Sequence, residues 1–389
     1  MKTPKHILPI IVLAQFCCTS LWFASNAVML DLVANFGLSD AAIGNLTSAV
    51  QFGFISGTLL FAIMTITDRF SPSRVFFICA LFGALCNAAL LWPDNTIGTL
   101  LVFRYLTGFF LAGIYPVGMK IAADYYDKGL GTSLGYLVGA LVVGTSFPHL
   151  LKNFDESLSW QSVISVTSVL AFFGGLVLWA MVPNGPFRKR SQKLQLNAFF
   201  KVFQNRKFKT AAFGYFGHMW ELYTFWAFTP FLLQTFSVTH ATKINIPLWS
   251  FVIIGVGGLA CVVAGYMSTN RGPKLVARSA LLLSGICCLL LPLFFLLGNQ
   301  TLYIAFLVFW GMVVIADSPL FSTMVAQNAI PEFKGTALTI VNCLGYTITI
   351  ISIQFLSFLT QYSTSIWVYT FLVLGPIFGL YHLFSRNSG

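Results

Sequence analysis

Long apolar segments alternate with short polar ones along the whole chain. Because about 20 apolar residues suffice for a helix that crosses a bilayer, the pattern predicts about twelve membrane-spanning helices. The first apolar run is continuous from Ile7 to Met29, which predicts one unbroken helix there. We expect the spans to begin near Ile7, Ala41, Arg74, Ile97, Gly131, Gln161, Thr210, Pro247, Leu275, Leu302, Ala337 and Ser365.

The positive charges lie in the polar gaps, and nearly all of those gaps fall on one side of the predicted membrane. If Met1 is cytoplasmic, only Arg104, Lys152 and Lys243 of the 22 Lys and Arg residues lie outside the cytoplasmic side. Cytoplasmic loops of membrane proteins carry this excess of Lys and Arg. We therefore expect a multi-pass protein of the cell inner membrane with both termini in the cytoplasm.

The composition leads to the same class of protein. Hydrophobic residues make up 57% of the chain and charged residues only 8%, whereas soluble domains contain about 25% charged residues. The formal net charge of +11 would suggest nucleic acid as a partner of a soluble protein. Here the basic residues flank membrane spans, so anionic lipid headgroups are the expected partners and nucleic acid is not.

The longest polar segment, residues 184–209, contains two basic clusters and separates an N-terminal half, 1–183, from a C-terminal half, 210–389. Two sequence markers recur in both halves. Asp68 aligns with Thr269 at an offset of 201 residues, and Tyr115-Pro116 aligns with Ser318-Pro319 at an offset of 203 residues. Recurrence at nearly one offset indicates duplication. We predict an all-α protein of two parallel six-helix halves related by a pseudo-two-fold axis, with a substrate site near the midplane.

These motifs resemble those of the major facilitator superfamily of secondary transporters. The loop signature of that family reads G-x-L-A-D-R-x-G-R-K; Gly265–Lys274 keeps its glycines and final Lys, and Asp68 and Arg69 keep its acid–arginine pair. A second signature, an Arg before a Gly/Ala-rich fourth helix, is matched from Arg104 to Gly113. The resemblance covers the whole chain and implies twelve helices, alternating access, and a gate in which the aspartate pairs with a neighbouring helix.

Three further segments are similar to a bacterial subset of that family often labelled nitrate/nitrite- or cyanate-transporter-like. They are Leu21–Asn26, Tyr115–Lys120 and Gly217–Tyr223. Nitrate carriers of the family share an Arg on each of the second and eighth helices, and neither span contains one here. Arg104 together with Trp22 and Asn26 favours a small organic solute with an anionic or polar group.

Ionisable residues inside spans are costly and are functional candidates by default. Glu221 lies about 11 residues into the seventh span, or about 16 Å along the helix, and His218 precedes it by three residues on the same helix face. The pair is either a proton relay, a substrate-binding pair or a structural bridge to another helix. Asp317 in the tenth span is either a second proton site, a partner for a buried cation or a cap for backbone groups near Pro319.

Arg104 in the fourth span either binds an anionic substrate, controls a carboxylate, or anchors the helix at the outer interface. Trp22 and Asn26, one turn apart in the first span, are candidate substrate contacts. Further substrate candidates are Tyr115 and Tyr223.

Asp68, Arg69 and Arg74 are candidate residues of a cytoplasmic gate. Asp68 is the one acid in a loop of basic residues. The alternative is a solvated loop charge.

The sequence bears on three classes of function: a transporter, a receptor or scaffold, and an enzyme. The prediction is a proton-coupled secondary transporter, with proton-driven efflux of amphipathic drugs or siderophores and a transport-dead receptor or scaffold as alternatives. The sequence has neither a Walker-type motif nor HExxH, and a GxSxG at Gly131–Gly135 opens an apolar helix instead of a strand-to-helix turn. We therefore expect no enzyme, catalytic residue, metal or cofactor. The expected partners of a monomer are its small-molecule substrate, protons and lipids.

Overall fold

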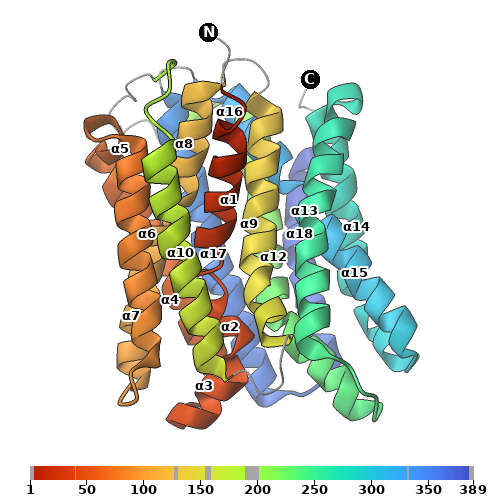
Figure 1. Ribbon diagram of the computed structural model, residues 1–389. Helices are drawn as coiled ribbons and strands as arrows, with labels where there is room; N and C mark the ends of the chain where they lie inside the picture. Colours follow the sequence, from red (N-terminus) through yellow and green to blue (C-terminus); the bar gives the residue numbers. More distant parts are fainter. Residues whose placement is uncertain are drawn as a thin grey trace. The chain divides into compact units, whose positions relative to one another are not determined.

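The computed structural model of the protein describes residues 4–39, 41–126, 130–153, 159–188, 201–330 and 333–384; of residues 68 and 130–132 it describes only the backbone. The chain divides into two compact units, Met1–Leu194 (unit 1) and Gln195–Gly389 (unit 2). The division falls within the segment assigned above to the linker. Figure 1 shows the helices of both units.

Unit 1 contains the helices that correspond to the first six predicted spans. In chain order they are α1 (Ile7–Thr19), α2 (Ala24–Ala27), α3 (Met29–Phe36), α4 (Ala42–Ile63), α5 (Ile66–Arg69), α6 (Pro72–Ala88), η1 (Ala89–Leu91), α7 (Ile97–Leu111), α8 (Tyr115–Tyr125), α9 (Leu130–Asn153) and α10 (Trp160–Met181).

Unit 2 contains the helices that correspond to the last six predicted spans. They are α12 (Arg206–Thr239), α13 (Ile246–Arg271), α14 (Pro273–Leu296), α15 (Gln300–Ala316), α16 (Ser318–Asn328), α17 (Lys334–Tyr362), η3 (Ile366–Val373) and α18 (Leu374–Phe384). Helix α12 begins before Thr210, inside the predicted linker.

Within the described ranges, 10 helical segments are long and apolar enough to cross a membrane. Helix α1, at the first predicted span, is a shorter apolar helix. Helix α12, at the seventh, has 34 residues but is not among those 10. The chain is thus a multi-pass helical membrane protein, as predicted, and a count of twelve spans requires α1 and α12 in addition.

The first predicted span is not one continuous helix. Helix α1 ends at Thr19, a turn occupies residues 20–23, and α2 begins at Ala24. The prediction of an unbroken helix from Ile7 to Met29 was therefore wrong. The local sequence does not predict the break, because the turn residues Ser-Leu-Trp-Phe include neither Pro nor Gly.

A close helix crossing occurs in each unit at the same relative position. A Cβ atom on Gly108 of α7 would lie 1.9 Å from the carbonyl oxygen of Val50 in α4. A Cβ atom on Gly311 of α15 would lie 1.9 Å from the carbonyl oxygen of Ile253 in α13. Gly108 and Gly311, and likewise Val50 and Ile253, are 203 residues apart, which is the offset of one of the two sequence markers. The repeated crossing supports the duplication, and only glycine allows so close a backbone approach.

Candidate functional site

The carboxylate of Glu221 lies in the interior of unit 2, with 1% of the residue exposed. Its Oε2 atom accepts a hydrogen bond from Ser284 Oγ at 2.6 Å. Its Oε1 atom accepts from Trp310 Nε1 at 2.6 Å and from Cys288 Sγ at 3.3 Å. Since Ser284 and Cys288 belong to α14 and Trp310 to α15, one carboxylate joins three helices.

His218 lies beside Asp317. Its Nδ1 atom is 2.8 Å from Asp317 Oδ1, and both side chains are almost completely buried. The sequence spacing had paired His218 with Glu221 instead, but the described contacts of Glu221 are with other helices. Asp317, between α15 and α16, makes no capping hydrogen bond through its side chain, so the cap interpretation was wrong. The second of its proposed alternatives, a cationic partner, fits this contact when His218 is protonated.

Tyr223 lies one and a half turns after His218 on α12 and contacts α17. Its hydroxyl is 3.0 Å from that of Tyr346, and both side chains are buried. Thr224 Oγ1 donates to Ser352 Oγ at 2.9 Å, which adds a second polar contact between the same helices. The segment of α12 that carries the acidic and aromatic candidates is therefore fixed on several sides.

Arg104 on α7 is a buried cation of unit 1, with 0% of the residue exposed. Its Nη1 atom donates to the carbonyl oxygen of Leu21 at 3.0 Å, and Nη2 donates to that of Trp22 at 2.5 Å. These carbonyls belong to the turn between α1 and α2, so the guanidinium satisfies the backbone groups that the break leaves without helical partners. The expectation that Arg104 anchors the helix at the outer interface was wrong, because the side chain is fully buried inside the unit.

Asn87 on α6 extends this network. Its Oδ1 accepts from Arg104 Nη1 at 3.5 Å, and its Nδ2 donates to Thr167 Oγ1 at 3.2 Å and Ser168 Oγ at 2.9 Å on α10. Within the described ranges, no carboxylate forms an ion pair with Arg104. Unit 1 therefore buries a positive charge that is bound by neutral acceptors.

Trp22 and Asn26, the substrate candidates of the first span, lie at and just after the break. The Trp22 ring is 4.9 Å from that of Phe54 on α4. Asn26 Nδ2 donates to Thr47 Oγ1 at 2.8 Å, also on α4. Both residues are buried, whereas Tyr115, the first residue of α8, is half-buried.

The gate candidates are less well defined by contacts. The side chain of Asp68 lies outside the described part of the structure. Arg69 and Arg74 are exposed, and neither forms an ion pair with a described side chain. A residue that sequence reasoning missed, Arg188, donates from Nη2 to the carbonyl oxygen of Phe70 at 2.8 Å, so the start of the linker contacts the candidate gate loop.

Sequence reasoning also missed the partners of the buried charges, Asn87, Ser284, Cys288 and Trp310. Asn87 and Ser284 could have been recognised as candidates, because each is a polar residue within an apolar span. Trp310 and Cys288 could not, since both residue types are ordinary in apolar helices. Among the described residues, no group of three or more His, Cys, Asp or Glu residues could hold a metal ion.

An all-helical membrane protein with buried charges in each of two repeated units has the construction of a transporter. The sequence profile of the Major Facilitator Superfamily matches residues 11–353. The chain belongs to this family, and the family and its structural neighbours indicate a transporter, not an enzyme.

Two curated relatives match parts of the chain. The thiamine pathway transporter THI73 of Saccharomyces cerevisiae is 25% identical over 217 residues, 50% of this chain and 40% of that protein. A putative metabolite transport protein of Haemophilus influenzae is 28% identical over 144 residues, 33% of each chain. The matches therefore span less than half the length of either relative.

Solved structures show the same fold at low sequence identity. The proton:xylose symporter XylE bound to 6-bromo-6-deoxy-D-glucose has a TM-score of 0.72 and 14% identity, with 96% of this chain and 94% of that chain covered. The nucleoside transporter NupG has a TM-score of 0.71 and 15% identity, with 98% of each chain covered. A bacterial homologue of the lysosomal transporter Spinster, inward-facing and unoccupied, has a TM-score of 0.70 and 17% identity, with 92% and 82% covered.

Proposed function

We propose that the protein is a proton-coupled secondary transporter of a small organic anion that works by alternating access. The observation that carries the proposal is the buried pair His218–Asp317, whose Nδ1 and Oδ1 atoms are 2.8 Å apart. An ionisable residue at membrane depth is costly, and two in contact indicate a function that needs them.

The chemistry of the pair suits reversible protonation. An aspartate and a neutral imidazole together carry one negative charge, and binding one proton to either group makes the pair neutral overall. Loading a proton thus removes a net buried charge. Such a change biases a two-state transporter when the two states solvate the pair differently.

Glu221 is the second carboxylate of the proposed coupling site. Its hydrogen bonds come from three donors on α14 and α15. A carboxylate bound in this way already has partners for its lone pairs, so we assign the proton primarily to Asp317 and His218. Glu221 would hold α12, α14 and α15 together and respond to the charge of the pair.

The anionic substrate is inferred from Arg104. The residue is fully buried, and its hydrogen bonds go to the neutral acceptors of Leu21, Trp22 and Asn87. A buried positive charge without a carboxylate partner among the described residues attracts an anionic group nearby. Because Arg104 also fixes the turn between α1 and α2, we assign it a positioning role for Trp22 as well as a charge-selecting one.

The remaining candidates keep supporting roles in the proposal. Trp22, Asn26 and Tyr115 are proposed substrate contacts of unit 1, and Tyr223 is the candidate of unit 2. Asp68, Arg69 and Arg74 are proposed as a cytoplasmic gate. We further propose an inner-membrane monomer with both termini in the cytoplasm.

The compared proteins support a small organic substrate. They include a thiamine pathway transporter, a nucleoside transporter and a proton:xylose symporter. The names differ in substrate, and one of them states proton coupling.

Transport by reconstituted protein tests the proposal. Proteoliposomes would be given an inwardly directed proton gradient, with the outside more acidic than the inside. The compounds tested would be a panel of radiolabelled small organic anions with neutral analogues of the same size. We expect gradient-driven accumulation of at least one anion by the unmodified protein. Asp317→Asn should abolish that accumulation while equilibrium exchange continues, because the amide cannot carry the proton. Asp94→Asn is the matched control, since Asp94 is exposed.

The other outcomes decide between the alternatives. Proton-driven movement of neutral amphipathic compounds, without anion uptake, would favour the efflux alternative. Absence of flux for every compound would favour a receptor or scaffold. Undiminished accumulation by Asp317→Asn would reject the His218–Asp317 pair as the proton site.

A further inference from the structure

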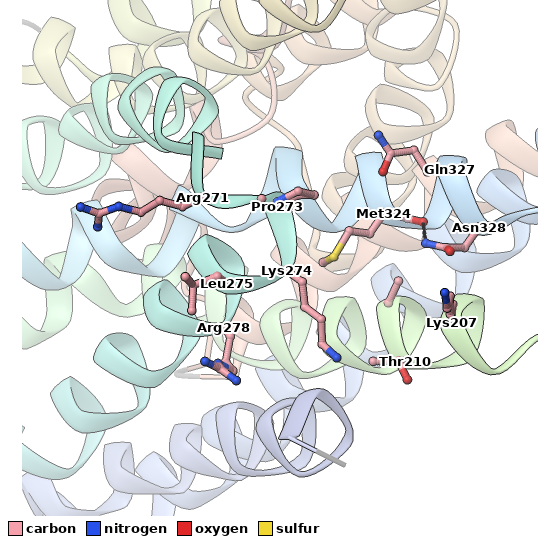
Figure 2. Close-up of a pocket in the computed structure, with 12 residues that line it drawn as sticks. Lys207, Thr210, Arg271, Pro273, Lys274, Leu275, Arg278, Met324, Gln327 and Asn328 are labelled. Atoms are coloured by element: carbon pink, nitrogen blue, oxygen red, sulfur yellow. Dashed lines mark hydrogen bonds between the residues drawn. The ribbon is translucent and has the colours of Figure 1, made fainter. Parts of the chain in front are cut away.

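A cavity outside the sites described above lies at one end of unit 2. It is bounded by the first turns of α12 and α14 and the last turns of α13 and α16, and its volume is about 490 Å³. Small-molecule sites have volumes of about 300–1,000 Å³. The lining residues, most of them labelled in Figure 2, are Lys207, Thr210, Ala211, Arg271, Gly272, Pro273, Lys274, Leu275, Arg278, Met324, Gln327 and Asn328.

The charge of the lining is entirely positive. Lys207, Arg271, Lys274 and Arg278 contribute four cations, and none of the described lining residues is acidic. In Figure 2 the Lys274 side chain extends toward Thr210 and Lys207, while Arg271 points away from them. Like charges that share one cavity repel each other, and a bound anion would relieve that repulsion.

Neighbouring groups reinforce this preference. The guanidinium of Arg278 lies 4.6 Å from the centre of the Phe384 ring, which restricts its position. Gly272 precedes α14 and offers no side-chain cap to the first turn of that helix. The hydroxyl of Thr210 supplies a further donor. Asn328 is a weaker donor for a ligand in the cavity, because its Nδ2 already donates to the carbonyl oxygen of Met324 at 2.7 Å.

The corresponding place in unit 1 is built differently. Pro72 opens α6 as Pro273 opens α14. The next residue in unit 1 is Ser73, whose hydroxyl donates to the carbonyl oxygen of Val182 at 2.6 Å. In unit 2 the next residue is Lys274, which lines the cavity. The equivalent position is thus occupied by Ser73 in unit 1 and by the cavity-lining Lys274 in unit 2.

We propose that this cavity binds a phosphate group, carried either by the headgroup of an anionic lipid or by a free phosphorylated solute. Lys207 and Lys274 would contact the phosphate oxygens, and Arg278 would supply a positioned third cation. This end of unit 2 is the one that the charge pattern predicts to face the cytoplasm, where anionic lipids attract basic residues. The proposal does not depend on proton coupling or on the transported substrate.

The test measures thermal stability of the purified full-length protein in detergent with three separate additions. These are dioleoylphosphatidylglycerol, dioleoylphosphatidylcholine, and sodium phosphate at an ionic strength matched with sodium chloride. The variants are Lys207→Gln and Lys274→Gln. The control is Lys243→Gln, which makes the same charge change at an exposed residue of the loop between α12 and α13.

We expect phosphatidylglycerol or inorganic phosphate to raise the midpoint temperature of the unmodified protein above the value with phosphatidylcholine, whose phosphate is balanced by the choline cation, because ligands that bind only the folded state stabilise it. The apparent affinity should fall roughly fivefold in each cavity variant and remain unchanged in Lys243→Gln. An effect of phosphatidylglycerol alone identifies a lipid headgroup, and an equal effect of inorganic phosphate identifies a free anion. No added stabilisation by either, or equal stabilisation of all four proteins, would overturn the proposal.

Discussion

Unit 1 begins with a broken helix and unit 2 with a continuous one. Helix α1 ends at Thr19 and α2 begins at Ala24, whereas α12 runs for 34 residues. In unit 1 the turn leaves backbone carbonyls without helical partners, and Arg104 donates to two of them. In unit 2 helix α12 continues through Pro230 without a break, and Glu221 is bound by side chains of neighbouring helices.

The difference explains the sign of each buried charge. Free carbonyls are acceptors, so a cation with several donors satisfies them. Hydroxyl, thiol and indole groups are donors, so a carboxylate satisfies them. Around these different centres the close crossing of Gly108 and Val50 is repeated by Gly311 and Ile253. The packing is therefore repeated while the polar chemistry is not.

The repeated crossing can be broken in both units by one methyl group. Gly108→Ala and Gly311→Ala would each place a Cβ atom 1.9 Å from a backbone oxygen, so the helices must separate. Overpacking usually costs about 1–3 kcal/mol, and we expect each crossing variant to lose more than that. The loss would appear as little or no folded protein in size-exclusion chromatography. Gly135→Ala and Gly265→Ala are the controls, because nothing lies within 4 Å of a Cβ atom at either. Normal folding of both crossing variants would refute the shared packing.

Substitution of Arg104 tests whether its guanidinium stabilises the turn between α1 and α2. Arg104→Met keeps an unbranched side chain but leaves two buried carbonyls without donors, and we expect a loss of about 2–4 kcal/mol. Arg104→Lys should restore only part of the lost stability, because an ammonium lacks the planar fork that reaches both carbonyls. Thermal unfolding measures the effect, with the exposed Arg74→Met as control. A loss no larger than that of Arg74→Met would show that the break does not need the guanidinium.

The corresponding change in unit 2 should be smaller. Trp310→Phe removes one donor to Glu221 and leaves Ser284 and Cys288 in place. We expect a loss of about 1.5 kcal/mol in the same unfolding assay. Trp367→Phe is the control, because Trp367 is 59% exposed. An effect as large as that of Arg104→Met would contradict the view that Ser284 and Cys288 keep Glu221 hydrogen-bonded without Trp310.

Much of the fold was readable from the sequence. Of the about twelve spans predicted from the length of the apolar segments, ten coincide with described helical segments long and apolar enough to cross a membrane, because burial of the backbone in lipid leaves few alternatives to a helix. The break after Thr19 was not predictable locally. It depends on Arg104, which lies more than 80 residues further along the chain.

The burial of the ionisable candidates was predicted from the sequence, but their pairing was not. Buried ionisable groups are conspicuous in apolar spans, so Glu221, His218, Asp317 and Arg104 were all found. The spacing of three residues suggested that His218 and Glu221 act together. In the structure His218 meets Asp317 from another helix, and only tertiary packing determines which of two nearby carboxylates it reaches.

The most direct test of the central claim is infrared difference spectroscopy of carboxyl protonation in the reconstituted protein. Spectra would be recorded between high and low pH for the unmodified protein, Asp317→Asn, Glu221→Gln and the exposed control Asp94→Asn. This measurement needs no knowledge of the substrate.

The account predicts a difference band of the buried pair on acidification, from either the protonated carboxyl of Asp317 or the imidazolium of His218, that disappears in Asp317→Asn and persists in Glu221→Gln and Asp94→Asn. A band that disappears in Glu221→Gln but persists in Asp317→Asn would contradict the assignment of the proton to the His218–Asp317 pair.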